Sequence, residues 1–333
     1  MKPIKIESLQ RKRERILEGT PVTVRNMNYQ DIKVKILAWF GLSRLSFHSV
    51  GILPFFLGTF LAWKIAGSFD ATVFILGNIA IILIMLSTYH AGEYSDHEED
   101  KISKRLFNSR FSGGSGVIPA GTLSRQVPFW TSLITFSMAA VIGIMLQYYF
   151  KTGPYTLILG CFGAFPGFFY STKPIRLVER GIGEMFIGFC YGWLPIASAF
   201  YIQTGFIHPI IHWIGLPVGL SIINVILLNE FPDYAADSSV GKRNMLVRLG
   251  KKAGGLAYML FSILAWIFMF LSIRAGVPAK ALYVYLPILG LSAFIVWMVL
   301  IKKYENPKTL EVLCGLNIAV NLGTTAAYIY AYM

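Results

Sequence analysis

The sequence predicts an all-α membrane protein with nine transmembrane helices. Of its 333 residues, 55% are hydrophobic and only 14% are charged, against about 25% charged residues in a typical soluble domain. Apolar segments long enough to cross a bilayer recur between breaks rich in glycine, proline and charge. Such segments fold as helices, because no water satisfies backbone polar groups inside a bilayer. This composition excludes a disordered chain, a disulfide scaffold and an ordinary cytosolic enzyme.

The chain begins with a polar, basic stretch over residues 1–44, which is predicted to be a cytoplasmic tail. No apolar segment directly follows its basic start, so no signal peptide is expected. A run at Arg11, Lys12, Arg13 and Arg15 indicates either a short amphipathic helix on the membrane surface or a solvated tail. Residues 45–333 are predicted to form one transmembrane domain. Its nine spans are expected at 46–66, 72–95, 127–149, 153–171, 182–203, 209–231, 254–274, 281–301 and 311–331.

The basic residues predict the orientation of these spans. Of the 30 Lys and Arg residues, only Lys64, Lys151, Arg274 and Lys280 fall at the ends opposite to the tail. Because cytoplasmic loops carry the excess of Lys and Arg, the amino terminus is expected in the cytoplasm and the carboxyl terminus outside a prokaryotic cell membrane. The net charge of +13 then reflects contact with anionic membrane lipid or an anionic substrate, and no nucleic-acid partner is expected. The three cysteines lie in apolar segments without paired spacing and are interpreted as core residues.

Eight of the 17 acidic residues fall in two short segments, at the ends of the second and sixth spans. The first acidic segment, GEYSDHEED, contains Glu93, Asp96, Glu98, Glu99 and Asp100, and the second, NEFPDYAAD, contains Glu230, Asp233 and Asp237. In one continuous helix, residues three and four apart share a face. Glu93, Asp96 and Asp100 are therefore predicted to face one way, with Glu98 and Glu99 outward. Asn229, Asp233 and Asp237 repeat the four-residue step, and Pro232 is expected to loosen that helix end.

The acids and the cations that follow them predict a site for a metal and a diphosphate. Ionised side chains near a membrane are costly, which favours a wet, cation-filled cavity over simple packing. Carboxylate oxygens without cysteine suit Mg²⁺. Lys104 and Arg105 follow the first acidic segment, as Lys242 and Arg243 follow the second. The acids, through a bound Mg²⁺, and the neighbouring Lys and Arg side chains would together bind a diphosphate.

Some of these residues, and others nearby, also fit other interpretations. A single acidic segment is more often a solvated helix end, but two matched segments favour a site. His90 and His97 lie seven residues apart and indicate a zinc site only weakly, because oxygen ligands dominate. The stretch FSGGSGVIPAG, residues 111–121, is interpreted as a flexible connector rather than a phosphate cradle. Tyr94, Tyr170 and Tyr234 lie near the acids and are candidates to shield a carbocation with their π faces.

These segments resemble the UbiA superfamily of intramembrane prenyltransferases, whose fold is nine helices around a central cavity. Residues 92–100 match the family's N-D-x-x-D-x-x-x-D motif at Glu93, Asp96 and Asp100, although Gly92 replaces the leading Asn and Glu93 the neighbouring Asp. Residues 229–243 match the D-x-x-x-D motif at Asp233 and Asp237, followed by Gly-Lys-Arg. YSTKPIRLVERGIGE, residues 170–184, resembles the loop after helix 4, which supplies basic residues to the diphosphate.

Within that superfamily, the chain is most similar to the 1,4-dihydroxy-2-naphthoate polyprenyltransferase branch of menaquinone biosynthesis. The resemblance implies Mg²⁺-dependent transfer of a polyprenyl group from prenyl diphosphate to a small lipophilic or aromatic quinone precursor, with release of diphosphate. The implied metal ligands are Glu93, Asp96, Asp100, Asp233 and Asp237, and the four aspartates together with Lys173 are the implied catalytic residues. The implied diphosphate contacts are Lys173, Arg176, Lys104, Arg105, Lys242, Arg243 and Asn229, with Tyr94, Tyr170 and Tyr234 around the prenyl cation or the acceptor.

Three rival functions also fit the sequence. A terpene cyclase of the same superfamily needs the same diphosphate chemistry and no acceptor, and a prenyltransferase with a non-quinone acceptor would share the whole site. A cation-coupled transporter would use the acids as an ion path. Both acidic segments lie on one side of the membrane, which disfavours the transporter because the other half offers no acids to relay an ion.

Overall fold

A computed structural model of the chain describes residues 29–106 and 109–333, and it divides the chain into two compact units, Met1–Leu37 and Ala38–Met333. In the first unit, the described residues belong to helix α2 (Tyr29–Leu42), which runs on into the second unit. The basic run at residues 11–15 lies outside the described residues. The division of the chain into a tail, 1–44, and a membrane domain, 45–333, stays a prediction.

The described residues form helices and no strand, so the predicted all-α fold is confirmed. The long helices of the second unit are α3 (Ser49–Ala66), α4 (Ala71–Ser95), α6 (Gln126–Ile144), α7 (Thr156–Phe168), α9 (Leu194–Thr204), α10 (Ile210–Ser239), α11 (Met245–Arg274), α12 (Ala281–Leu300) and α13 (Pro307–Tyr332). Shorter elements are α5 (His97–Leu106), α8 (Gly183–Gly188), the 3₁₀ turns η1 (Leu45–Phe47), η3 (Leu177–Glu179) and η5 (Lys303–Glu305), and the π-helical turns η2 (Met145–Tyr149) and η4 (Phe189–Trp193).

Nine helical segments correspond to the nine predicted spans. Within the described residues, eight are long and apolar enough to cross a membrane, and α8, η4 and α9 count as one of them because they run on without a break. The ninth is α7, an apolar helix of 13 residues in place of the predicted span 153–171. The expectation of an integral membrane protein is thereby confirmed.

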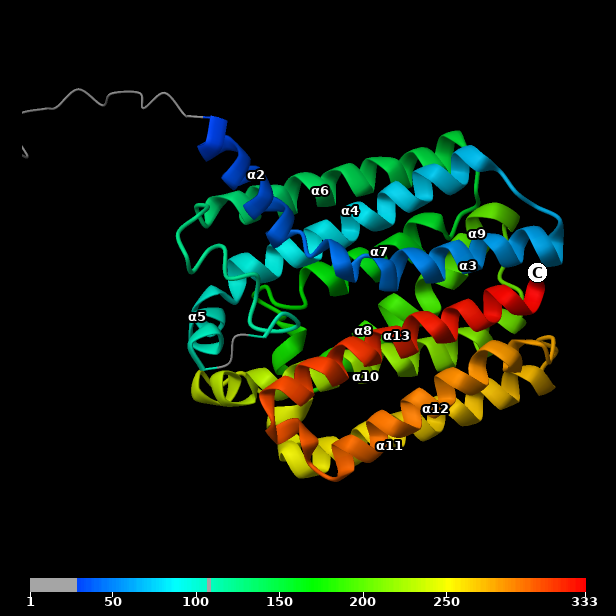
Figure 1. Ribbon diagram of the computed structural model, residues 1–333. Coiled ribbons are helices and arrows are strands. Elements are labelled where there is room, and N and C mark those ends of the chain that lie inside the picture. Colours follow the sequence, from blue (N-terminus) through cyan, green and yellow to red (C-terminus); the bar gives the residue numbers. More distant parts are fainter. Residues whose placement is uncertain (1–28, 107–108) are drawn as a thin grey trace, which may run out of the picture. The chain divides into compact units, whose positions relative to one another are not determined.

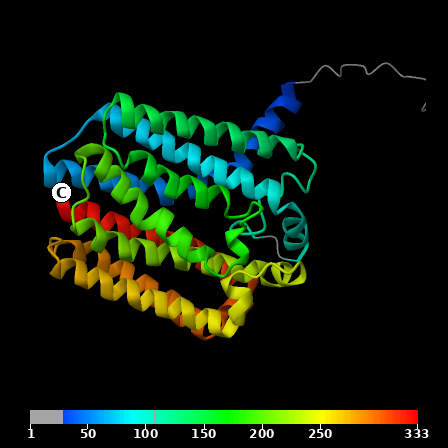
Figure 2. The same ribbon diagram turned by 180° about the vertical axis from the view of Figure 1, so that it is seen from behind.

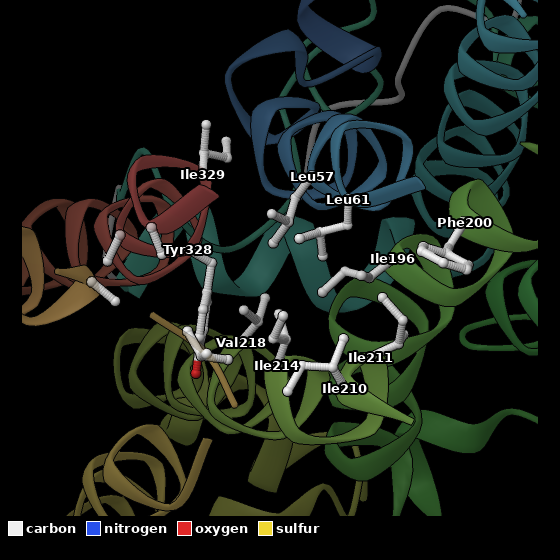
Figure 3. Packing of buried hydrophobic residues seen from close by; sticks show 14 of the residues in the cluster. Leu57, Leu61, Ile196, Phe200, Ile210, Ile211, Ile214, Val218, Tyr328 and Ile329 are labelled. Carbon is white, nitrogen blue, oxygen red and sulfur yellow. The ribbon is translucent and has the colours of Figure 1, made fainter. Parts of the chain in front are cut away.

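Helix α10 is the central element of the second unit. It packs against α11, α13, α8 and η4, while α4 packs against α6 and α3 against α9 (Figures 1 and 2). Among the eight long spans it is the most buried. Figure 3 shows the apolar contacts that hold it, where Ile211, Ile214 and Val218 of α10 meet Leu57 and Leu61 of α3 and Ile196 between them. All six of these side chains are fully buried.

The acidic segments lie at one end of this bundle. Figure 1 shows α5 at that end and the carboxyl terminus at the other. Helix α4 stops at Ser95, Asp96 leaves the helical conformation with φ −93° and ψ 12°, and α5 starts at His97. The prediction of one continuous helix across residues 93–100 is therefore wrong. Helix α10, in contrast, continues past Pro232 as far as Ser239.

Candidate active site

A cavity of about 210 Å³ lies between the two acidic segments. The residues that line it and that the sequence singled out are Glu93, Asp96, Asp100, Tyr170, Asn229, Asp233, Asp237 and Lys242. Its wall also includes residues that sequence reasoning did not propose for the site, among them Arg44, Tyr89, Gly113, Gly114, Ser171, Tyr191 and Asn244. Acids from α4, α5 and α10 thus face one space, as the two motifs predict.

Asp96 is held by the loop that follows α7. Ser171 Oγ donates a hydrogen bond of 2.5 Å to Asp96 Oδ2, and Arg176 Nη2 donates one of 3.1 Å to Asp96 Oδ1. The same guanidinium pairs with Glu99 and lies 3.1 Å from Glu179 Oε1. Arg176 does not itself border the cavity but fixes one of its acids from behind.

Glu99 does not border the cavity, yet it is shielded from solvent. It is buried and paired with Arg176, whereas Glu98 is exposed and contacts Lys101 and His97. Glu93, Asp96 and Asp100 all border the cavity and Glu99 does not, but the ion pair with Arg176 buries Glu99 against the loop after α7 instead of leaving it in solvent, as its predicted outward placement implied.

Glu93 is buried, and its two oxygens already accept hydrogen bonds. Ser115 donates to it through its backbone N–H at 2.7 Å and its hydroxyl at 2.9 Å. Arg44 Nη2 lies 3.4 Å from Glu93 Oε1. Arg44, which the sequence places at the end of the tail, is therefore part of the cavity wall.

The glycine-rich stretch after α5, residues 111–121, contacts both acidic segments. The N–H of Gly113 donates to Asp233 Oδ2 at 2.9 Å, and the hydroxyl of Ser103 donates to Asp233 Oδ1. At Gly114, with φ +65°, a Cβ atom would lie 2.1 Å from Asp100 Oδ2. The stretch is thus more than a connector, and the N–H groups of Gly113 and Ser115 point at carboxylates. Burial, followed by the charges of Glu93 and Asp96, raises the pKa of Asp100 well above its ordinary value.

Asp237 is held by the turn that joins α10 to α11. Asn244 Nδ2 donates to Asp237 Oδ2 at 2.8 Å, while its Oδ1 caps α11 by accepting from Val247 N at 2.8 Å. Lys242 Nζ lies 3.5 Å from Asp237 Oδ1. Burial alone would favour the neutral amine of Lys242, but the charges of the surrounding acids, Asp96 and Asp237 foremost, outweigh it and raise the pKa. Lys242 is therefore a cation of the cavity wall, with 13% of its side chain exposed.

Two further glutamates lie at or beside the cavity. Glu230 borders it, and its Oε2 accepts from Leu246 N at 3.3 Å. Glu184 is fully buried and accepts from Met245 N at 2.8 Å. Both hold the first turn of α11. The signal for Glu184 was present in the sequence, since it is a lone acid at the start of an apolar span.

Besides Arg176, six of the predicted site residues do not line the cavity: Lys104, Arg105, Lys173, Arg243, Tyr94 and Tyr234. The amine of Lys104 donates to the carbonyl oxygens of Ser109 and Ser112, at 2.7 and 3.2 Å, and so holds the glycine-rich stretch. Arg105 and Arg243 are exposed. Lys173 and Tyr94 border a separate surface pocket of about 650 Å³, and the ring of Tyr94 lies under Arg125, 4.4 Å from its guanidinium carbon. Tyr234 faces Lys251, 5.2 Å from its ring centre.

The donors of the cavity fit a hard cation that is shared with a phosphate. Within residues 29–106 and 109–333, no three His, Cys, Asp or Glu side chains are grouped closely enough to hold a metal alone. Mg²⁺ commonly takes one or two carboxylates and completes its shell with water and substrate phosphate. Asn229 Oδ1 is buried without a hydrogen-bond partner in the described structure, as expected for an oxygen that completes such a shell. The zinc alternative finds no support there, because His90 bonds Ser43 while His97 bonds Glu98.

The fold and the site define an intramembrane enzyme whose acid-lined cavity opens among transmembrane helices. The chain belongs to the UbiA prenyltransferase family, whose model matches residues 51–320. The prenyltransferase that the motifs predict is thereby confirmed.

Relatives with assigned names are distant. The "UbiA prenyltransferase domain-containing protein 1" of Dictyostelium discoideum is 23% identical over 67% of this chain and 67% of its own length. The 2-carboxy-1,4-naphthoquinone phytyltransferase of Synechocystis is 25% identical over 65% of this chain and 67% of its own. The 1,4-dihydroxy-2-naphthoate octaprenyltransferase of Bacillus subtilis is 22% identical, over 61% of this chain and 63% of its own. The chain thus matches about two thirds of the length of these relatives.

Solved structures share the fold. A digeranylgeranylglyceryl phosphate synthase superposes with a TM-score of 0.63 at 17% identity, covering 90% of this chain and 98% of the other. A UbiA homolog from Archaeoglobus fulgidus bound to GPP and Mg²⁺ superposes with a TM-score of 0.58 at 14% identity, covering 88% and 99%. At these identities the likeness establishes the architecture.

Proposed function

We propose that this protein transfers a polyprenyl group from prenyl diphosphate to an aromatic quinone precursor, with Mg²⁺ as the required cation. The observation that carries the proposal is the single cavity that Asp96, Asp100, Asp233 and Asp237 all border beside the cation of Lys242. An anionic substrate bridged to carboxylates by Mg²⁺ would balance the charge of this wall. The A. fulgidus homolog, bound to GPP and Mg²⁺, supports the proposed cation and donor.

The acceptor we favour is 1,4-dihydroxy-2-naphthoate, as in menaquinone biosynthesis. Relatives that carry this name come from B. subtilis and Escherichia coli, and the E. coli protein is 24% identical over 64% of this chain. The second candidate is a non-quinone acceptor, because the digeranylgeranylglyceryl phosphate synthase of Pyrococcus horikoshii is 22% identical over 63% of this chain. A UbiA-type terpene cyclase is the third. Membership in a prenyltransferase family makes the cation-coupled transporter the weakest alternative.

In the proposed reaction the C–O bond of the prenyl diphosphate breaks, diphosphate leaves, and the allyl cation forms a C–C bond with the acceptor ring, which then loses a proton. Mg²⁺, when bound, would neutralise charge on the leaving diphosphate. Lys242 stays protonated beside it, and Arg176 and Ser171 keep Asp96 in place. Tyr89, Tyr170 and Tyr191 present aromatic rings to the cavity, where they would stabilise the cation, and its apolar wall would exclude water.

Only part of the predicted diphosphate set is kept in this proposal. Of the predicted diphosphate contacts, Lys242 and Asn229 border the cavity, so we assign the diphosphate to these two residues, and Arg176 acts only by positioning Asp96. We further propose that the acidic end of the bundle faces the cytoplasm of a prokaryotic cell, with the carboxyl terminus outside. The excess of basic residues on the acidic side supports this orientation.

The test is a radiolabelled prenyl-diphosphate assay of the full chain in vesicles. The acceptors offered are 1,4-dihydroxy-2-naphthoate, 4-hydroxybenzoate and a glycerol-phosphate derivative, and products are identified by mass spectrometry. We expect a prenylated naphthoate product that depends on Mg²⁺ and is lost in Asp233→Asn but kept in the exposed control Glu305→Gln. Full activity in excess chelator would overturn the metal role. A cyclic product that forms without an acceptor would show that the protein is a terpene cyclase and not a prenyltransferase.

A further inference from the structure

The surface pocket of about 650 Å³ lies at the acidic end of the bundle, outside the cavity of the proposed site. Its walls come mainly from the end of α4, the start of α5, the first turns of α6 and the segment that follows α7, residues 168–176. Figure 1 shows that α6 begins at the same end as α5. Because membrane-spanning helices end near the polar boundary of the bilayer, the pocket lies at that boundary.

Two cations on the rim of this pocket, Arg125 and Lys173, have donors to offer an anion. Within residues 29–106 and 109–333, Lys173 is exposed and makes no hydrogen bond or ion pair. Arg125 is exposed as well, and in the same part of the chain it donates only from Nε, to the carbonyl oxygen of Tyr94 at 3.0 Å. The terminal nitrogens of Arg125 and the amine of Lys173 therefore present charged donors, which bind phosphate well.

The acids beside these rim cations already have cationic partners. Glu99 forms an ion pair with Arg176, and Glu98 Oε1 lies 3.3 Å from the amine of Lys101. The charge that remains on the pocket is the positive charge of the two rim cations. The pocket therefore favours a ligand with a negative group.

The wall next to the rim cations is apolar. Phe129 and Leu133 lie four residues apart on one face of α6, and the rim arginine lies four residues before Phe129. Phe168 of α7 also borders the pocket, and its ring centre lies 5.6 Å from that of Phe136 on α6. Phe136 also contacts Phe165, which is half exposed. The apolar lining thus continues from the pocket along the contact between α6 and α7.

The pocket and the cavity of the proposed site share the segment that holds Asp96. Ser171 borders both spaces, and Arg176 borders the pocket. Both side chains donate hydrogen bonds to the carboxylate of Asp96, at 2.5 and 3.1 Å. Lys173 lies between them in the sequence. A ligand that binds Lys173 would therefore restrain the segment that positions Asp96.

We propose that this pocket binds an anionic phospholipid, and that the bound lipid keeps the segment after α7 in place. The phosphate lies at Arg125 and Lys173, and an acyl chain lies along Phe129 and Leu133. A phospholipid fits because the pocket joins a cationic rim to an apolar wall at the membrane boundary. A free anion would leave the apolar wall unused, and a zwitterionic lipid would bring a cation of its own to the rim.

The test measures the binding of lipid to the full chain in a neutral detergent, without substrate. Native mass spectrometry gives the affinity of the first bound dioleoyl phosphatidylglycerol, with dioleoyl phosphatidylcholine as the comparison. Arg125→Gln/Lys173→Gln removes both rim cations. We expect its affinity for phosphatidylglycerol to fall roughly 30-fold, because each Lys or Arg at a membrane surface strengthens the binding of anionic lipid about fivefold.

The matched control is Lys303→Gln/Lys308→Gln, which also removes two charges. Both lysines are exposed and border no part of the pocket. They lie at the start of α13, whose other end carries the carboxyl terminus, so they belong to the acidic end of the bundle (Figure 1). The control should keep an affinity close to that of the unmodified protein. An equal loss in the two double variants would show that phosphatidylglycerol responds to overall charge, and it would overturn the proposal.

A second measurement locates the lipid in the unmodified protein. A phosphatidylglycerol with a photoreactive group in its acyl chain should label Phe129, Leu133 or Phe168. Labelling confined to other helices would overturn the proposal. So would equal affinities for phosphatidylglycerol and phosphatidylcholine, or an affinity for glycerol phosphate alone that matches that for the whole lipid.

The effect of the lipid on rate is measured separately, and this part of the inference rests on the proposed function. In vesicles, prenyl transfer should be faster with phosphatidylglycerol than with phosphatidylcholine. Arg125→Gln/Lys173→Gln should abolish the difference, and the control should keep it. Lipid binding without any difference in rate would overturn the role of the lipid in holding the segment after α7. If no prenyl diphosphate is consumed in either lipid, the proposed function fails, whereas the binding result stands.

Discussion

Arg176 Nη2 lies 3.1 Å from Asp96 Oδ1, and this contact joins the loop after α7 to the first acidic segment. The guanidinium also pairs with Glu99 and Glu179, so it holds three carboxylates although it does not border the cavity. The loop that the sequence assigns to direct diphosphate binding therefore contributes first by orienting an acid. Its exposed neighbour Lys173 points to a different surface pocket.

Arg176→Gln should lower kcat by about 100-fold, a loss comparable to that of one preorganised charged contact in an active site. The reason is that Asp96 would keep only the hydrogen bond from Ser171. Arg243→Gln is the control, because Arg243 is exposed and borders no part of the cavity. Both variants are compared by steady-state kinetics at saturating Mg²⁺. Equal activities would show that Arg176 does not position Asp96.

The sequence could predict the helices and both acidic segments because these depend on local composition and spacing. It could not predict partners brought in from distant parts of the chain. Ser171 reaches Asp96, and Ser115 reaches Glu93, only because loops fold back over the end of the bundle. The same limit explains why Tyr234 was wrongly expected at the site. It has an aromatic ring and lies in the second acidic segment, but it is on a face of α10 that packs toward Lys251.

Glu99→Gln should destabilise the protein and lower its activity, whereas Glu98→Gln should behave as wild type. Glu99 is buried against Arg176, and loss of one partner from such a pair costs about 2–5 kcal/mol. Glu98 is 66% exposed, and surface pairs contribute little. The check is a thermal unfolding curve of each variant in the same detergent. If Glu98→Gln were less stable than Glu99→Gln, the burial of Glu99 and the exposure of Glu98 would be contradicted.

Tyr170→Leu should reduce kcat by roughly 5- to 30-fold, because a cation–π contact in a desolvated site contributes about 1–2 kcal/mol. Tyr170 borders the cavity, and burial, together with the charges of Glu184 and Glu230, raises its pKa well above the ordinary value, so the phenol stays neutral. Tyr170→Phe keeps the ring and should retain most of the rate. Tyr234→Leu serves as the control outside the cavity. A loss in Tyr170→Phe equal to that in Tyr170→Leu would point to the hydroxyl instead.

Gly114→Ala should nearly abolish activity. A Cβ at this residue would lie 2.1 Å from Asp100 Oδ2, and the backbone has a φ of +65°, which favours glycine. The glycine-rich stretch would have to move away from the acids, taking with it the N–H that Gly113 donates to Asp233. Gly121→Ala has a similar φ of +71° but meets no described atom within 4 Å, so it separates backbone strain from the clash with Asp100. Matching activities of the two variants would rule out that clash as the cause.

Gly92→Asn, which restores the residue of the family motif, should be tolerated and should lower or preserve the Mg²⁺ concentration for half-maximal rate. Gly92 borders the cavity one helical turn before Asp96, and a Cβ there would meet only Ser171 Oγ, at 3.8 Å. An Asn side chain therefore has room, and its amide oxygen would be a further hard donor for the cation. Gly92→Leu is the matched control, similar in size but without the oxygen. If both variants raise the Mg²⁺ requirement equally, the space beside Gly92 is occupied by substrate, and the smallest residue is required there for fit.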